Sequence, residues 1–188
     1  MSGRPINPRN DRNINQTNRT DINIIYGTQG DDKIIEKVTD DPDHIDVGEV
    51  IKKLTDGRDH IFAQEGADTI VGSLGGDTID LGYDDDPDQV KYTNFSQRRD
   101  MITNFDTDED IVVISSDFLS DLEEYEGLNP DANVGDWLKI DQFGSDAYIR
   151  VDPDGLEGNS PFRTLAILKD VNANDLDINI VDNEFIIG

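Results

Sequence analysis

Three consecutive nonapeptides constrain the fold of this chain more than any other feature. They read LTDGRDHIF, AQEGADTIV and GSLGGDTID and occupy residues 54–62, 63–71 and 72–80. Each has glycine at its fourth position, aspartate at its sixth and isoleucine at its eighth. These residues are Gly57, Gly66 and Gly75, then Asp59, Asp68 and Asp77, and then Ile61, Ile70 and Ile79. A strict period of nine predicts a solenoid in which each repeat supplies one short strand and one turn.

The three fixed residue types have different physical roles. Glycine permits the tight left-handed turn, and isoleucine starts a strand whose side chain enters the core. Aspartate supplies a hard carboxylate oxygen, the ligand type that Ca²⁺ prefers. The pattern therefore predicts Ca²⁺ as the bound metal and turns as the place where it binds.

Further copies extend the repeat on both sides. Residues 27–35 read GTQGDDKII, which places Gly30 and Asp32 at positions four and six. Residues 40–45 (DDPDHI) and 85–90 (DDPDQV) echo each other, and each follows a good repeat. We assign the sixth position there to Asp43 and Asp88, with Asp41 and Asp86 as the rival choices. Residues 46–53 break the pattern.

These residues resemble the RTX (repeats-in-toxin, haemolysin-type) calcium-binding family. The resemblance implies a parallel β-roll with two nonapeptides per turn, in which backbone carbonyls and sixth-position aspartates of repeats two apart hold Ca²⁺. It implies that Asp59 and Asp77 share one ion and that Asp68 shares another with Asp86 or Asp88, while Asp32 belongs to a third site with no assigned partner. The predicted metal-site residues are Gly27, Gly30, Asp32, Asp43, Gly57, Asp59, Gly66, Asp68, Gly75, Asp77, Asp86 and Asp88.

The resemblance continues towards the C-terminus. Residues 100–105 (DMITNF) and 106–114 (DTDEDIVVI) resemble the strand-turn-strand that follows the roll in proteins exported by type I secretion. Residues 147–154 and 163–171 resemble the terminal hairpins of that region, and residues 184–187 (EFII) match a terminal pattern of one acidic and three apolar residues. The resemblance implies the type I secretion machinery as a partner and a secreted, extracellular or cell-surface location.

The predicted fold class is all-β. It comprises a flexible leader over residues 1–23, a β-roll over 24–92 and an antiparallel β-cap over 93–188. In the cap, alternation predicts strands over 136–143, 147–151, 164–168, 178–181 and 185–187. Residues 116–126 are the one helix candidate, with Ser116 as its N-cap.

Composition narrows the partners. The formal net charge is −26, from 42 acidic and 16 basic residues. Nucleic acid and anionic membrane surfaces are negatively charged, like this chain, and are excluded as natural partners, whereas divalent cations are favoured. The sequence has no cysteine for disulfides or thiolate metal sites. We expect no membrane insertion, because no apolar run approaches the ~20 residues of a span. The N-terminus also lacks an apolar signal-peptide core.

Two other acidic runs, residues 106–110 and 152–155, favour solvated turns, with accessory Ca²⁺ ligands as the alternative. The sequence contains two histidines and neither an H-E-x-x-H nor a G-x-S-x-G motif, so we expect no enzyme activity. The predicted function is a calcium-binding protein whose repeats fold on binding Ca²⁺. It would be exported and act as a structural or adhesive module, with a cell-surface or polysaccharide partner. The alternative is an intracellular calcium sensor or buffer.

Overall fold

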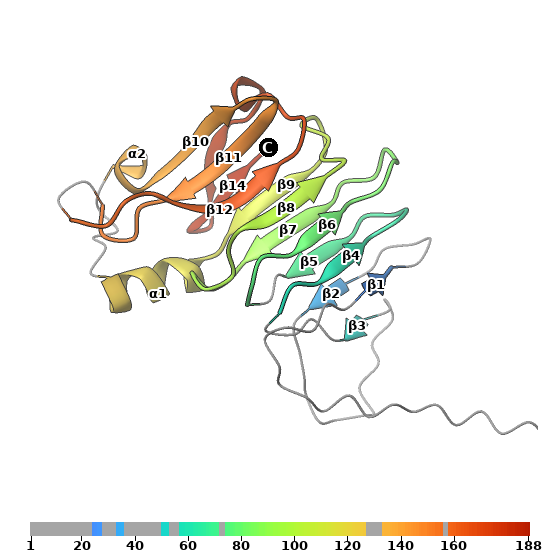
Figure 1. Cartoon of the computed structure of the whole chain (residues 1–188), viewed down its shortest axis with the longest axis horizontal. Coiled ribbons are helices and arrows are strands. Elements are labelled where there is room, and N and C mark those ends of the chain that lie inside the picture. The colour runs from blue at the N-terminus through green and yellow to red at the C-terminus, as the bar shows by residue number, and fades with distance from the viewer. Residues whose placement is uncertain are drawn as a thin grey trace, which may run out of the picture.

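The computed structural model describes residues 24–27, 33–35, 50–52, 57–71, 74–126, 133–155 and 158–188. The predicted leader, over residues 1–23, lies outside the described residues. So do Gly30, Asp32 and Asp43. The strands of the described chain form two seven-stranded sheets (Figure 1).

Successive repeat strands alternate between the two sheets. The first sheet stacks β1, β4, β6 and β8 in parallel, and the second stacks β3, β2, β5, β7 and β9 in parallel. The bounds are β1 Ile24–Tyr26, β2 Lys33–Ile35, β3 Val50–Lys52, β4 His60–Phe62, β5 Thr69–Val71, β6 Thr78–Asp80, β7 Gln89–Tyr92, β8 Asp100–Thr103 and β9 Ile111–Ile114. Because of this alternation, residues two repeats apart become neighbours in one sheet.

The eighth-position side chains fill the space between the sheets. Ile61, Ile79 and Ile102 come from one sheet, and Ile70 and Val90 come from the other. All are fully buried in one apolar cluster. A single apolar residue per three-residue strand therefore suffices, because stacking joins these residues into a continuous core.

Both sheets continue past the repeats into the C-terminal part of the chain. In the first sheet, β8 pairs in parallel with β12 (Arg163–Leu168), and β11 (Asp146–Val151) and β10 (Leu138–Phe143) follow as antiparallel strands. In the second, β9 pairs with β14 (Glu184–Ile187), which pairs with β13 (Ile178–Val181), both antiparallel. The mostly-β class is confirmed. The sheets are mixed, however, rather than a parallel roll with a separate antiparallel cap.

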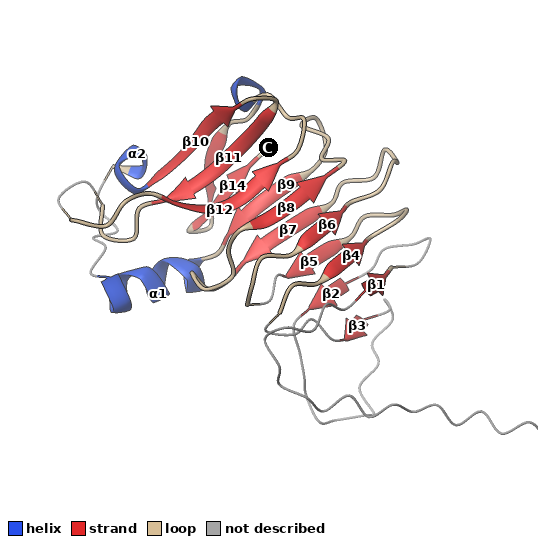
Figure 2. Ribbon diagram, in the orientation of Figure 1, coloured by secondary structure: helices blue, strands red, loops and turns tan. Residues whose placement is uncertain are grey.

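Helices are few, as expected (Figure 2). The predicted helix is α1 (Ser116–Glu126), but the side chain that accepts the Phe118 N–H is Ser115 Oγ, at 3.3 Å, so the N-cap is Ser115 rather than Ser116. A short helix, α2 (Val134–Trp137), delays the strand expected from residue 136 until Leu138. A 3₁₀ turn, η1, covers Ala173–Asp175.

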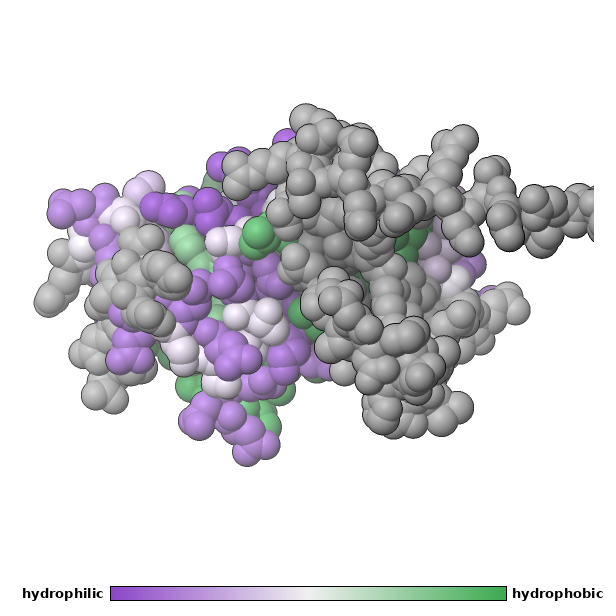
Figure 3. All heavy atoms as spheres, turned by 90° about the horizontal axis from the view of Figure 1, so that it is seen from below, coloured by the Kyte–Doolittle hydropathy of each residue, from purple (hydrophilic) through white to green (hydrophobic). Residues whose placement is uncertain are grey.

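The visible surface of the described residues is mostly hydrophilic, with isolated apolar side chains (Figure 3). No helix in the described part of the chain has the length and apolar character needed to cross a membrane.

Strand β3 was missed by sequence analysis because its segment carries no nonapeptide signature, yet it pairs in parallel with β2.

Candidate functional site

Six buried aspartates form two columns beside the strand starts. In the first sheet, the backbone N–H of Asp59 donates to Asp77 Oδ1 (2.9 Å), and the N–H of Asp77 donates to Asp100 Oδ1 (2.9 Å). In the second sheet, the N–H of Asp68 donates to an oxygen of the next aspartate in its column. The Asp68 N–H donates to Asp88 Oδ1 (2.8 Å), and the Asp88 N–H donates to Asp110 Oδ1 (2.9 Å). All six side chains are only 0–4% exposed.

The main chain ties the same aspartates to the neighbouring turns. Asp77 accepts the N–H of Met101 with its carbonyl oxygen (2.8 Å), and Asp59 accepts that of Thr78 (2.9 Å). In the other column, the carbonyl oxygen of Asp68 accepts the N–H of Gln89, and that of Asp88 accepts the N–H of Ile111. The main chain of each of these aspartates is thus held in register by the strand that follows in the next repeat of its column.

Two fourth-position glycines take the backbone conformation that these turns need. Gly66 has φ of 106° and Gly75 has φ of 135°, values that L side chains rarely adopt. Gly75 also forms a parallel bridge with Gln97. The glycine of the repeat is therefore a steric requirement of the turn that positions the next aspartate.

The columns concentrate negative charge away from water. Burial, with the charges of Asp110 and Asp68, raises the pKa of Asp88 to about 8. Burial, with the charge of Asp77, raises the pKa of Asp100 to about 7, and burial also raises the pKa of Asp110. A cation beside these carboxylates would reverse the effect.

The outer carboxylate oxygen of the last aspartate in each column accepts a hydrogen bond from another residue of the protein. Asp100 Oδ2 accepts the hydroxyl of the buried Tyr92 at 2.8 Å, and Asp110 Oδ2 accepts the N–H of Asp106 at 2.9 Å. Both carboxylate oxygens of Asp100 and of Asp110 are therefore hydrogen-bonded within the protein. These two residues terminate the columns.

Tyr92→Phe is expected to destabilise the protein by about 1–3 kcal/mol, because Asp100 Oδ2 loses its donor while it stays buried. Urea unfolding of the Ca²⁺-loaded protein measures the loss. Tyr83→Phe is the matched control, since Tyr83 is 92% exposed. Equal free energies of unfolding for the two variants would contradict the role of Tyr92.

The structure brings most of the described predicted site residues together. Asp59 and Asp77 share one column and Asp68 and Asp88 share the other, whereas the rival Asp86 is exposed and donates its N–H to Asp84 Oδ1 (3.0 Å). Gly27 is buried and donates its N–H to Phe62 O (2.7 Å). Gly57, which lies two residues before Asp59, is also buried. Which of these residues bind metal stays a prediction.

Sequence analysis did not include Asp100 among the metal-site candidates, and it offered Asp110 only within the run 106–110, as an accessory ligand in the alternative interpretation. Their signal was present, because Asp100-Met101-Ile102 and Asp110-Ile111-Val112 both keep an aspartate two residues before a buried apolar residue. The fourth-position glycine is missing from both. The aspartate-to-apolar spacing would have found them.

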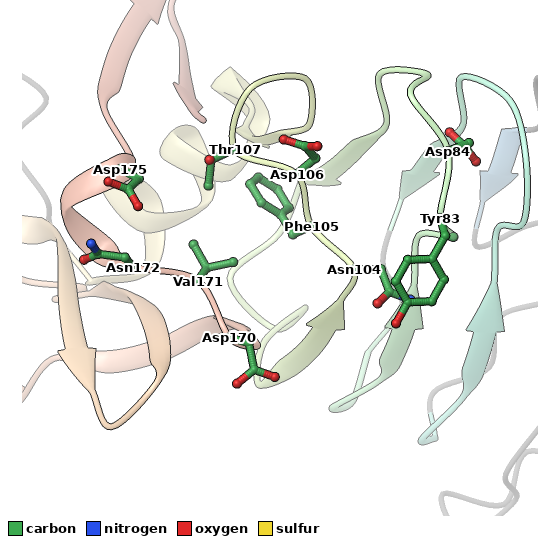
Figure 4. A pocket seen from close by; sticks show the side chains of 11 residues that line it. Tyr83, Asp84, Asn104, Phe105, Asp106, Thr107, Asp170, Val171, Asn172 and Asp175 are labelled. Atoms are coloured by element: carbon green, nitrogen blue, oxygen red, sulfur yellow. The ribbon is translucent and has the colours of Figure 1, made fainter.

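A polar groove lies beside the end of the roll strands (Figure 4). It has a volume of about 380 Å³ and joins three segments, residues 82–84, 104–107 and 170–175. Four carboxylates line it, with the amides of Asn104 and Asn172; the carboxylates are those of Asp84, Asp106, Asp170 and Asp175. Tyr83 stands almost fully exposed at its rim.

The donor set of the columns fits Ca²⁺. Their carboxylates are hard oxygen ligands, and Ca²⁺ completes its shell with backbone carbonyls and water. Within the described residues, no three Asp, Glu, His or Cys side chains converge on one point. An ion beside the columns would therefore take most of its ligands from other groups than carboxylates.

Comparison with known proteins gives a structural neighbour but no family. No protein-family model and no curated protein matches the chain. Among solved structures, the chain is similar to the AlgE6R3 subunit of a mannuronan C5-epimerase from Azotobacter vinelandii. The identity is 18% and the TM-score 0.43, over 80% of this chain and 72% of that one.

This neighbour corrects the expectation that the chain has no enzyme activity. The similar structure is a subunit of an enzyme. The expectation rested on motifs of unrelated catalytic folds. It was wrong as an exclusion.

Proposed function

We propose that this chain is a calcium-binding repeat protein of the RTX type, with Ca²⁺ bound in the turns beside the two aspartate columns. The observation that carries the proposal is the burial of six stacked aspartates, each 0–4% exposed. The charged neighbours that act on Asp88 most strongly are themselves carboxylates. Such an arrangement needs either protons or cations for stability.

Calcium binding would supply folding energy. Two like charges 4 Å apart repel by ~4 kcal/mol at an effective dielectric constant of 20. A domain is stabilised by only ~5–15 kcal/mol, so a few such pairs decide whether the roll is folded. Ca²⁺ reverses the sign of these interactions, and its binding energy becomes part of the folding energy.

The proposal includes export by type I secretion and work outside the cell as a structural or adhesive module. Extracellular calcium modules bind at about 10⁻⁴–10⁻³ M, so such a chain would stay unfolded inside the cell and fold outside. Phe185 and Ile187 of the terminal pattern are buried in β14, which pairs with β9. A machinery that reads this pattern must therefore meet the chain before it folds.

Replacing Glu184 and Ile186 by alanine is expected to lower the amount of protein in the culture medium several-fold. Both residues are half-buried, so the folded protein should tolerate the change. Ile180→Ala with Val181→Ala is the matched control, because both side chains are exposed on the adjacent strand β13. Calcium-dependent circular dichroism of the purified variants checks that folding is intact. Equal export of the two double variants would contradict the terminal signal.

The adhesive surface we propose is the groove beside Tyr83, with a neutral polysaccharide as its partner. An exposed aromatic ring offers a face for stacking on a sugar, and the surrounding carboxylates and amides accept and donate hydrogen bonds to hydroxyl groups. The carboxylates disfavour acidic polymers.

Tyr83→Ala should abolish retention on a neutral polysaccharide column, whereas exposed Phe143→Ala should not. Equal retention of the two variants would contradict this surface.

A further inference from the structure

The few cations of this acidic chain are not spread evenly over the described residues. Four of them lie over two aromatic rings, those of Phe95 and Phe162, and a fifth lines a pocket together with Phe162. These cations are Arg98, Arg99, Lys139, Arg150 and Arg163. In a chain of net charge −26, such clustering has a local electrostatic cost, because like charges are held together.

Three of these guanidinium groups surround a pocket. The pocket has a volume of about 440 Å³ and is lined by Arg98, Arg99, Phe162, Arg163 and Thr164. Among the described residues that line it there is no carboxylate, and each of their polar side chains can donate a hydrogen bond. The pocket lies at the junction where β8 pairs with β12.

The pocket walls are fixed by contacts within the protein. The guanidinium carbons of Arg98 and Arg163 lie 5.0 and 5.5 Å from the Phe95 ring centroid. Arg98 Nη1 also donates to Phe95 O at 3.1 Å. On the other side, Arg150 Nη2 donates to Phe162 O at 2.8 Å, and Lys139 Nζ lies 4.2 Å from the Phe162 ring centroid. A ligand would therefore meet a site that is already formed.

Arg99 is held in an unusual backbone conformation. Its φ is 75°, in the left-handed region, and its N–H donates to Leu165 O at 2.7 Å. Its carbonyl oxygen lies close to Gly76, where an added Cβ would be 3.0 Å away. Strained residues of this kind persist where the surrounding structure holds them, and they gather at binding sites. Arg99 is exposed and is one of the residues that line the pocket.

The nearby carboxylates are engaged elsewhere. Asp141 pairs with Lys139 and Arg150 at 3.1 and 3.0 Å, and Asp121 Oδ2 accepts the N–H of Phe95 at 3.1 Å. Within the described part of the chain, Arg99 and Arg163 have no carboxylate at ion-pair distance. The charge of Arg163 acts on Asp152, whose charged form it favours, and the charge of Arg99 is not neutralised by an ion pair within the described residues.

We propose that this pocket binds the oxyanion group of a small organic molecule, through the guanidinium groups of Arg99 and Arg163, with Arg98 and Thr164 completing the donor set. Guanidinium groups bind carboxylate, sulfate and phosphate oxygens in paired hydrogen bonds. A volume of about 440 Å³ exceeds the need of an inorganic ion and matches a small-molecule site, with the Phe162 ring as its apolar wall. Arg99 directly precedes the column residue Asp100, but no column residue lines the pocket among the described residues, and the proposal does not depend on the calcium proposal.

Calorimetric titration of the full-length, Ca²⁺-loaded protein with benzoate and with inorganic sulfate tests the proposal. Sodium chloride at equal ionic strength is the reference. We expect saturable binding of at least one probe, weakened about tenfold or more in Arg99→Gln and in Arg163→Gln. Stronger binding of benzoate would indicate a carboxylate ligand, and stronger binding of sulfate would indicate a tetrahedral oxyanion.

Arg58→Gln is the matched control, because Arg58 is also an exposed arginine directly before a column aspartate. Circular dichroism establishes that each variant is folded, and two independent pocket variants protect the test if one of them is not. Arg99→Lys should also bind weakly, because lysine keeps the charge but loses the planar fork. Absence of saturable binding by both probes, or an equal loss in Arg58→Gln, would overturn the proposal.

Discussion

Asp77→Asn is expected to raise the Ca²⁺ concentration needed for half-maximal stabilisation about tenfold or more. The metal-free variant should be at least as stable as the metal-free parent protein. Asparagine keeps an oxygen that can accept the Asp59 N–H, now made at 2.9 Å, so the column can persist. It removes one buried negative charge, and the charge of Asp77 is one of the causes that raise the pKa of Asp100. The change therefore favours the metal-free fold and weakens the attraction for Ca²⁺.

The measurement is the Ca²⁺ concentration that gives half of the maximal rise in melting temperature. Asp182→Asn is the matched control, because Asp182 is exposed in the turn between β13 and β14. Asp77→Ala provides a further comparison, since it also removes the acceptor for a buried N–H and should cost about 1–3 kcal/mol without metal. A Ca²⁺ dependence of Asp77→Asn equal to that of Asp182→Asn would contradict the role of the column.

The metal-free protein is expected to lose stability as the pH rises from about 4 to about 8. The pKa values of Asp88 and Asp100 are raised from 3.8 to about 8 and about 7, so the folded state holds protons that the unfolded state releases. Their stabilising contribution is complete below the unfolded pKa and is lost as the pH passes through the folded values. Asp141, Asp146 and Asp154 have lowered pKa values and act with the opposite sign, but only near or below their usual pKa.

Melting temperatures of chelator-treated protein at about pH 5 and about pH 8.5 check this window. The Ca²⁺ affinity should rise over the same range, because the metal competes with the bound protons. Asp100→Asn should flatten the dependence and Asp182→Asn should not. A metal-free melting temperature that increases between these two pH values would contradict the buried-carboxylate account.

The strict period of nine predicts one short strand and one turn per repeat, whereas the alternation of the repeats between two sheets was expected only from the RTX resemblance. Nine residues allow one strand and one turn, and each repeat aspartate directly precedes a three-residue strand whose second residue is the isoleucine. The identity of the column residue near residue 88 could not be settled in the same way. The Pro87 loop lengthens the turn by two residues, and only pairing of Gln89 with Thr69 shows that Asp88, not Asp86, is in register.

The C-terminal half was harder to predict because its contacts are long-range. Alternating patterns located β11, β12 and β13, but nothing local states that β12 joins the repeat sheet beside β8 or that β14 joins the other beside β9. The basic pocket was missed for the same reason. Arg99 and Arg163 are 64 residues apart in sequence, and only the β8–β12 pairing brings them together.

Far-ultraviolet circular dichroism during a Ca²⁺ titration of chelator-stripped protein, with Mg²⁺ as control, is the most direct test of calcium-coupled folding. The account predicts a cooperative gain of β signal with Ca²⁺ and none with Mg²⁺. A midpoint near 10⁻⁴–10⁻³ M would favour extracellular use, and one near 10⁻⁷–10⁻⁵ M would favour an intracellular sensor. A β spectrum that is already complete without Ca²⁺ would contradict the account, because the core alone would then hold the aspartate columns together.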